Sequence, residues 1–441
     1  MFTSSPKLCL RRHLNNACVV ATTPASMWAC CRTSKRKPEG VACASDILGA
    51  GSFVSKKIIA IFAASFKRTL MDVTIFQTRM RNLLAGLLVL VSMLPAYGGE
   101  TMENETTDEC AGSVQRSPEA SRLLNYLQGI YGSKTLSGTC ANVNWNINEA
   151  EWVHQHTGKW PALNCFDFIH LPLTKPGGWI DYSNTKVVED WHEAGGIVAL
   201  MWHWNVPANN GRGYAFYYGK EDEKTLFDVR KIFDEDSEEY ARMMKDIDQV
   251  GTYLKKLADK GIPVIWRPLH EAGGRWFWWG MDAEACKQLW KVMYRRFADA
   301  GINNLIWAFT PAAAWKEPYS KGFDWYPGDE YVDIVGMDVY NQPSAADCYR
   351  LDFQFLQEQK PLKMAALTEC GSVAPISAQW EAGAKWLFFM PWYDYGRTAH
   401  PSSEAFGSPS HSNASIDWWQ DAFSCDFVLT REDVKRHLHS F

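Results

Sequence analysis

The sequence predicts an α/β protein in which eight parallel strands and the helices between them close into a single (β/α)8 barrel. From about residue 117, short apolar runs alternate with longer amphipathic segments, as repeated strand–helix units require. The apolar runs number eight, and no low-complexity stretch divides them. The segment 117–441 is also long enough for such a barrel with insertions. A single domain is therefore expected there.

The expected strands are short runs rich in aliphatic and aromatic residues, each bounded by polar or turn-forming residues. In chain order they are Thr135–Gly138, Pro161–Phe166, Ile197–Trp202, Pro263–Pro268, Asn304–Phe309, Val332–Met337, Leu362–Thr368 and Ala384–Met390.

Two of the intervening helices stand out. In Ser237–Lys260, apolar residues recur at steps of three and four before Gly261, and Ala283–Ala300 shows a similar pattern. Both end a few residues before a predicted strand, as αβ loops require. The segments 205–236 and 394–424 read as long insertions after the third and eighth strands, on the face where barrel loops carry function.

The charge of the chain is divided unevenly. Residues 1–98 hold 13 Lys and Arg against 3 Asp and Glu, whereas residues 99–441 hold 32 against 47. An acidic body excludes a nucleic-acid partner, because phosphates need a basic surface. Of the 21 tryptophans, Trp28 alone precedes residue 99. Indole rings stack well on sugar rings, although most tryptophans serve as core.

A signal peptide is predicted at residues 80–98. Met80-Arg81-Asn82 provides a basic start, the run 83–94 is apolar, and small residues follow up to Gly98. Twelve apolar residues are too few to span a bilayer, so a transmembrane helix is the less favoured alternative. The mature chain is therefore expected to be exported, periplasmic or secreted, without a membrane span.

Residues 1–79 fit no part of this scheme, because a signal peptide should start a protein. They are interpreted as a non-native extension, with translation beginning at Met80 or Met71; an unusual targeting extension is the alternative. Residues 99–116 form a short linker.

The sequence contains no recognisable cofactor or metal motif. Seven cysteines follow residue 98, without the spacing of a zinc site, and no GxGxxG, P-loop or HExxH pattern occurs. No metal or organic cofactor is expected. One or two disulfides are compatible with export, but the sequence does not define their pairing.

Two glutamates follow predicted strands and face the carboxyl end of the barrel. Glu271 ends the fourth, in Trp-Arg-Pro-Leu-His-Glu, and Glu369 ends the seventh, in Ala-Leu-Thr-Glu-Cys-Gly. Glycoside hydrolysis needs one protonated and one ionised carboxyl group at the scissile bond. The aromatic run 276–279 would raise the pKa of Glu271, as a general acid requires. Tyr340 is placed to donate a hydrogen bond to Glu369.

The stretch 266–271 and the Trp-Phe-Trp-Trp-Gly run at 276–280 are similar to the signature of glycoside hydrolase family 26, whose members are mainly β-mannanases. The resemblance covers about 117–440. It implies that Glu271 is the acid/base and Glu369 the nucleophile. The other residues it implicates, in contact with substrate or with the catalytic carboxylates, are His203, Arg267, His270, Trp276, Trp315, Asp338, Tyr340 and Trp392.

The resemblance implies a retaining enzyme that cleaves β-1,4-mannosidic bonds in mannan, glucomannan or galactomannan by double displacement. The expected partner is a β-mannan polysaccharide or oligosaccharide, and a monomer is expected. Two alternatives stay open: a relative acting on mixed-linkage β-glucan or β-1,3-xylan, and a non-catalytic glycan-binding protein. For His203 and the tryptophans, an ordinary structural role is the competing interpretation.

Overall fold

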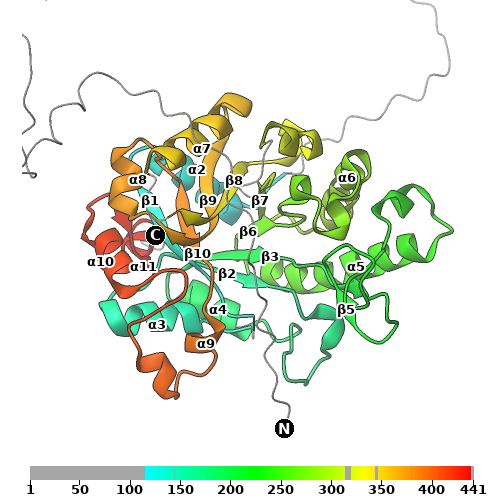
Figure 1. The fold of residues 1–441 in the computed structure, drawn as a ribbon, viewed down its shortest axis with the longest axis horizontal. Helices are drawn as coiled ribbons and strands as arrows, with labels where there is room; N and C mark the ends of the chain where they lie inside the picture. The colour runs from blue at the N-terminus through cyan, green and yellow to red at the C-terminus, as the bar shows by residue number, and fades with distance from the viewer. Residues whose placement is uncertain (1–114, 144, 313–318, 343–345, 439–441) are drawn as a thin grey trace, which may run out of the picture. The chain divides into compact units, whose positions relative to one another are not determined.

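Eight parallel strands form a closed barrel surrounded by helices, as predicted from the sequence (Figure 1). The computed structural model describes residues 115–143, 145–312, 319–342 and 346–438. Each barrel strand pairs in parallel with the next, and the last pairs back with the first. That last pairing removes both free edges of the sheet.

All eight predicted strands are present. They are β1 (Thr135–Cys140), β2 (Leu163–Asp167), β3 (Ile197–Met201), β6 (Val264–Arg267), β7 (Leu305–Phe309), β8 (Ile334–Gln342), β9 (Met364–Val373) and β10 (Phe388–Pro391). The largest difference from the prediction is that β8 and β9 continue well past Met337 and Thr368. Their extra residues keep pairing with each other, up to Gln342 opposite Val373. The pattern of apolar residues does not reveal pairing of this kind, so the sequence did not predict it.

Helices cover the outside of the barrel. They are α2 (Pro118–Ile130), α3 (Asn148–Thr157), α4 (Lys186–Glu193), α5 (Glu238–Asp259), α6 (Ala283–Asp299), α7 (Ala346–Gln359), α8 (Ile376–Glu381), α9 (Tyr395–Thr398), α10 (Ile416–Ser424) and α11 (Arg431–Leu438). Both helices predicted by range are found, as α5 and α6. Ser237 and Asp282 cap them by accepting hydrogen bonds from backbone N–H groups three residues on.

Several short elements were not predicted, because two to seven residues carry too little pattern to be recognised. The strands are β4 (Val206–Pro207) and β5 (Tyr214–Ala215), which form a hairpin in the insertion after β3, and β11 (Val428–Leu429), which pairs with β1. The 3-10 helices are η2 (Leu171–Leu173), η3 (Val229–Phe233), η4 (Ala272–Gly274), η5 (Trp278–Gly280), η6 (Tyr319–Trp325), η7 (Asp329–Tyr331) and η8 (Glu404–Gly407).

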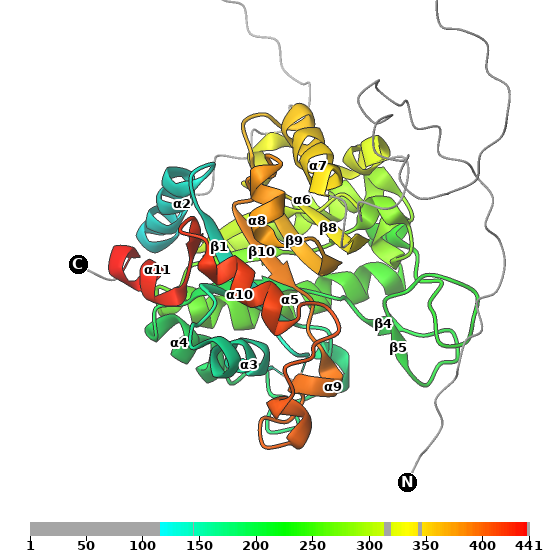
Figure 2. The ribbon, with the colours of Figure 1, turned by 60° about the vertical axis from the view of Figure 1, so that its left-hand side comes forward.

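The barrel strands are apolar on both faces, as strands covered by helices must be. In β6, Ile265 belongs to the cluster inside the barrel, while Val264 and Trp266 pack outwards against the helices. Leu127 of α2 and Val434 of α11 join the inner cluster. These two helices lie side by side (Figure 2). They cover the amino-terminal end of the barrel, which leaves the carboxyl end for substrate.

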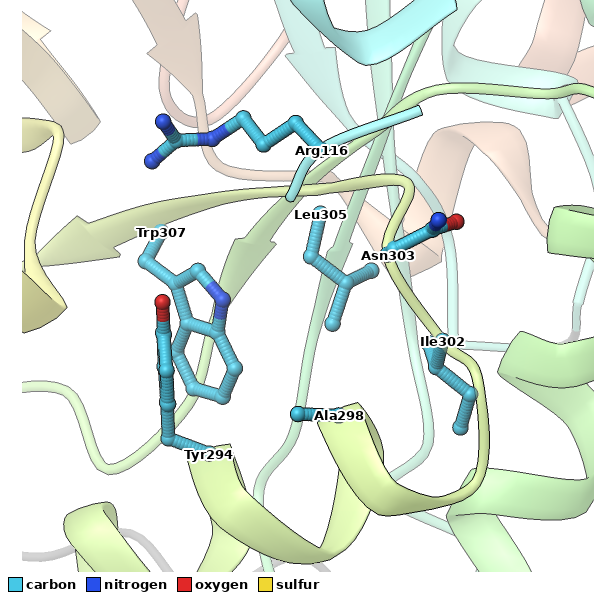
Figure 3. A pocket seen from close by; sticks show the side chains of 7 residues that line it. All are labelled: Arg116, Tyr294, Ala298, Ile302, Asn303, Leu305 and Trp307. Carbon is cyan, nitrogen blue, oxygen red and sulfur yellow. The ribbon is translucent and has the colours of Figure 1, made fainter. Parts of the chain in front are cut away.

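A small cavity lies between α6 and the start of β7 (Figure 3). Seven residues line it: Arg116, Tyr294, Ala298, Ile302, Asn303, Leu305 and Trp307. Its free volume of about 10 Å³ is enough for one water molecule at most. It is therefore a packing defect on the outside of the barrel and not a sugar site.

Candidate active site

Glu271 is held just beyond β6 by a strained turn. Leu269 and Glu271 both have left-handed backbones, with φ of 49° and 55°, which is costly for residues other than glycine. The turn is tied to the loop after β7, because the Glu271 N–H donates to the Thr310 carbonyl at 2.9 Å and the Gly273 N–H to the Pro311 carbonyl at 2.7 Å. Such strain persists only where the surroundings fix it.

Glu369 reaches the same space from within β9 because the strand is irregular. Met337 pairs with Leu367, but the next residue, Asp338, pairs with Glu369, so Thr368 is an extra residue in β9. Pairing with β10 shifts at the same place. A bulge re-aims the side chains that follow it. Thr368 and Glu369 therefore both make hydrogen bonds within the site, although they are adjacent in sequence.

The Glu369 carboxylate receives strong donors. Arg267 Nη1 donates to Oε1 at 2.7 Å, and the Tyr340 hydroxyl donates to Oε2 at 2.7 Å. His270 Nε2 lies 3.9 Å from Oε1. Glu369 is only 5% exposed. A guanidinium and a phenol O–H at these distances stabilise the negative charge of a buried carboxylate.

Glu271 has the opposite environment. Burial raises its pKa well above the usual range, and the charges of Asp338 and Glu369 raise it further. Its hydrogen bond from Trp276 Nε1, at 2.9 Å, opposes this rise. The neighbouring carboxyl group, Asp338, accepts from the Arg267 guanidinium and from the Thr368 hydroxyl. Because Asp338 receives these charged and hydroxyl donors, a proton in the site belongs on Glu271.

Arg267 and Asp338 lie beneath the two glutamates and are fully buried. The guanidinium donates to Asp338 and, through Nε, to Thr310 Oγ1 at 2.9 Å. Thr368 Oγ1 donates to Asp338 at 2.7 Å. Burial raises the pKa of Asp338 to about 7, with Arg267 opposing that rise. The sequence implicated both residues in the site, and the structure places them in contact with its carboxyl groups.

Gly336 makes room for this network. A Cβ at that position would collide with the side chain of Thr368 and come within 2.8 Å of Thr310 Oγ1. These two hydroxyls are hydrogen-bonded to each other at 3.0 Å. Only glycine therefore lets β8 approach them.

Two histidines form a second buried pair. His203 Nδ1 donates to Asp167 Oδ2 at 2.7 Å, and His270 Nε2 lies 3.1 Å from His203 Nε2. Burial lowers the pKa of His270 well below its usual value, and the charge of Arg267 lowers it further. Burial also lowers the pKa of His203, but Asp167 reverses this and gives a net rise. The hydrogen bond between the two Nε2 atoms thus fixes both rings beside Glu369.

Of the predicted tryptophans, Trp276 and Trp392 are half-buried at the mouth of the barrel. The Trp392 ring lies 5.6 Å from that of His203. Trp278 and Trp279, by contrast, are fully buried and support the site from outside. Trp315 lies outside the described residues.

A scan against known families matches glycosyl hydrolase family 26 over residues 113–405. That match covers most of the barrel and both glutamates. The chain belongs to glycosyl hydrolase family 26. This confirms the resemblance seen in the sequence.

Two solved structures share the fold. The family 26 domain of an endo-β-mannanase/endo-β-glucanase from Prevotella bryantii is 38% identical, with a TM-score of 0.64, covering 72% of this chain and 97% of that one. A β-mannanase from a symbiotic protist of the termite Reticulitermes speratus, solved with a gluco-manno-oligosaccharide, is 31% identical, with a TM-score of 0.59, covering 73% and 97%.

Curated relatives are similar to the chain as well. A mannan endo-1,4-β-mannosidase of Thermothelomyces thermophilus is 34% identical over 322 residues, which is 72% of this chain and 61% of that protein. Two further mannan endo-1,4-β-mannosidases, from Piromyces sp, are each 32% identical, with 44% and 47% of their length covered. The family 26 chain thus spans less than two thirds of these relatives.

Sequence reasoning missed Tyr217 in the insertion after β3. Its side chain is 49% exposed, and the charges of Glu271 and Glu369 add to the burial that raises its pKa. The insertion folds back onto the turn after Glu271, since the Tyr218 N–H donates to the Trp276 carbonyl at 2.8 Å. Tyr217 therefore lies near both glutamates, with part of its side chain open to solvent. In the sequence, only the position of Tyr217 within a predicted insertion pointed to a role in the site.

The insertion after β10 is anchored by a buried glutamate that the sequence did not reveal. Glu149 of α3 accepts hydrogen bonds from the Asp394 N–H at 2.7 Å and from His411 Nε2 at 3.0 Å, and another from the Thr398 hydroxyl. Asn413, two residues after His411, donates to the carbonyls of Trp392 and Tyr393 at 3.2 and 3.1 Å. This network therefore fixes the position of Trp392 in the mouth.

The described part of the chain holds no cluster of three or more metal-ligating side chains. Its six cysteines are free: Cys140, Cys165, Cys286, Cys348, Cys370 and Cys425. Over the same residues, no helix is both long and apolar enough to cross a membrane.

We predict that Glu149→Gln lowers stability, because an amide offers one acceptor oxygen where the carboxylate offers two and turns an N–H towards donors. The expected loss is about 1–3 kcal/mol in the free energy of unfolding, the usual cost of an unsatisfied buried group. Urea unfolding measures it. Glu151→Gln, on the same helix but outside the network, is the matched control. Equal stability of the two variants would contradict the anchoring role.

Proposed function

We propose that this family 26 chain is a retaining β-mannanase, cleaving β-1,4-mannosidic bonds in mannan, glucomannan or galactomannan. One observation carries the mechanism: two buried glutamates share a site in opposite electrostatic environments. Glu369 is charged and held by donors, while burial and nearby charge keep a proton on Glu271. Glycoside hydrolases need one carboxyl group of each kind, and the resemblance to family 26 implies the retaining course.

In the first step, Glu369 attacks the anomeric carbon and the bond to the leaving oxygen breaks. Glu271 gives its proton to that oxygen, and a covalent glycosyl–enzyme forms. In the second step, Glu271, now ionised, takes a proton from water as the water oxygen attacks the same carbon. Glu369 leaves, Glu271 regains its proton, and the anomeric configuration is retained.

The other site residues are assigned by what they contact. Arg267 and Tyr340 stabilise the charge of Glu369, and Asp338 holds Arg267. His203 and His270 form the floor beside Glu369, where the hydrogen bond between their rings fixes the surface that the sugar meets. Trp276, Trp392 and Trp315 are proposed to stack on sugar rings. No step requires a metal or an organic cofactor.

The names of the relatives support mannan as the substrate. The three curated relatives described above are called mannan endo-1,4-β-mannosidases, and the protist enzyme was solved with a gluco-manno-oligosaccharide. None of those names fixes the tolerance for galactose branches in this chain.

The test is reducing-sugar release by residues 99–441 from β-1,4-mannan, glucomannan, mixed-linkage β-glucan and β-1,3-xylan. We expect hydrolysis of the first two and its loss in Glu271→Ala and Glu369→Ala, by about 100-fold or more. An aryl mannoside with an acidic leaving group separates the roles, because it needs no proton: Glu271→Ala should still release the aryl alcohol once, and Glu369→Ala should not. Activity on another glycan alone would reject mannan, and inactivity on all four would favour a binding protein.

The pH dependence should report Glu271. An acid must be protonated to act, so kcat/KM falls as the pH rises through its raised pKa. The hydrogen bond from Trp276 Nε1 stabilises the ionised form of Glu271. Trp276→Phe removes this bond and should raise the pKa of Glu271 further, so that the alkaline limb of the kcat/KM profile moves to higher pH. Trp380→Phe, a half-buried tryptophan of α8 that stacks on Phe427, is the control. A shift to lower pH in Trp276→Phe would refute the assignment.

We propose that the protein is exported, on the basis of the apolar run 83–94 and its basic start. These residues lie outside the described part of the chain. Mass spectrometry of the native protein should find a mature amino terminus near residues 97–100. A terminus upstream of residue 80 would reject the signal peptide.

A further inference from the structure

Asp167 is a buried carboxylate at the carboxyl end of β2 that holds both the backbone and the ring of His203. Its Oδ1 accepts from the His203 N–H at 3.0 Å, and its Oδ2 accepts from His203 Nδ1 at 2.7 Å. The Asp167 side chain is fully shielded from solvent. Within the sheet, Asp167 pairs with Met201, the last residue of β3. The two side-chain bonds therefore continue the contact between the strands past the end of β3, where His203 lies.

This carboxylate determines which nitrogen of His203 carries a hydrogen. A carboxylate can only accept, so Nδ1 must carry the hydrogen, and a neutral ring then has a bare Nε2. His270 Nε2 lies 3.1 Å from that atom. Because a bare nitrogen can only accept, the hydrogen of this contact sits on His270 Nε2.

A protonated His203 would reverse the contact and leave an N–H unpaired. His203 would then donate from Nε2, and His270 would have to carry its hydrogen on Nδ1, which is buried and has no hydrogen-bond partner among the described residues. A buried N–H without an acceptor is costly. Burial and Arg267 lower the pKa of His203, but Asp167 and Glu369 give it a net rise. The neutral form, in which each N–H of the pair has an acceptor, is therefore the form present above that raised pKa.

The ring of His270 carries this arrangement to the nucleophile. Its Nε2 lies 3.9 Å from Glu369 Oε1, which is too far for a hydrogen bond but close enough for charges to interact strongly in a buried site. A hydrogen on Nε2 gives the carboxylate a positive N–H edge as its neighbour. A hydrogen on Nδ1 would leave a lone pair there instead. The position of one hydrogen thus decides whether His270 attracts or repels the charge of Glu369.

We propose that Asp167 is a positioning residue for the nucleophile: by accepting from His203 Nδ1, it sets the tautomers of both histidines and keeps the hydrogen of His270 on Nε2, beside Glu369. This inference rests on the proposed function, in which Glu369 attacks the sugar. Asp167 acts through the two imidazole rings and not by touching the substrate.

The decisive variant is Asp167→Asn, which keeps the size of the side chain but replaces one acceptor oxygen by an N–H donor. The backbone N–H of His203 still needs the amide oxygen, so the amide N–H faces Nδ1, and the bond between His203 and His270 reverses. We expect kcat on mannohexaose to fall about 10- to 100-fold with KM unchanged, the range found where a carboxylate that orients a metal-bound histidine is removed. Steady-state kinetics measure both constants.

Two comparisons separate positioning from a structural role. Asp333 also accepts from a backbone N–H, that of Trp307 at 2.9 Å, and from Arg116, but before β8 at the other end of the barrel. Asp333→Asn should lower the melting temperature without changing kcat. The second comparison is His203→Ala, which removes the ring and keeps the backbone N–H. Adding Asp167→Asn to it should lower kcat no further, because the path through the ring is already lost; an additional fall would overturn the proposal.

The tautomer can also be measured in the unaltered protein, which keeps the proposal testable if Asp167→Asn does not fold. Nitrogen-15 NMR of protein labelled in its histidine rings distinguishes an N–H from a bare nitrogen, and the His270 signals are those lost in His270→Asn. We expect the hydrogen on Nε2. A hydrogen on Nδ1, or an unchanged kcat in folded Asp167→Asn, would overturn the positioning role alone. An unaltered protein inactive on every mannan would reject the proposed function, and the NMR result would still decide the tautomer.

Discussion

The buried guanidinium of Arg267 is the interaction on which the site depends. It contacts two carboxylates, Asp338 and Glu369, and a third carboxyl group, Glu271, lies beside them. Burying charges is costly unless they are paired. One cation cannot neutralise three anions, so a proton must stay in the cluster. The distribution of donors then places that proton on Glu271, because Asp338 and Glu369 already receive charged hydrogen bonds.

This electrostatic arrangement requires particular backbone geometry. Because Thr368 is an extra residue in β9, its hydroxyl can donate to Asp338 while the next side chain, Glu369, enters the same site. The left-handed turn at Glu271 brings the other carboxyl group within reach from β6. Gly336 gives the threonine hydroxyls room. The bulge and the turn depart from regular strand geometry, and all three features lie within a few residues of a carboxyl group. The closed barrel around the site holds these costly backbone conformations in place.

The long insertions complete the site that the barrel begins. One folds back onto Trp276 and brings Tyr217 near the glutamates. The other is fixed through Glu149 and holds Trp392. Both segments were recognised in the sequence as insertions on the functional face, but neither Tyr217 nor Glu149 was singled out. Their importance arises from contacts with residues far away in the chain, which local patterns do not encode.

The sequence by itself determined the eight strands, the helices α5 and α6, and the family, because apolar periodicity and a dense motif around Glu271 are local properties. It also singled out both glutamates. The tertiary structure decided how their surroundings differ: the bulge at Thr368, the extension of β8 and β9, and the burial of Arg267 and Asp338 beneath the site. These features depend on strand register and on the sharing of charge between distant residues. The physical reason is that pairing energy and desolvation are set by neighbours in space, whereas a sequence pattern records only neighbours along the chain.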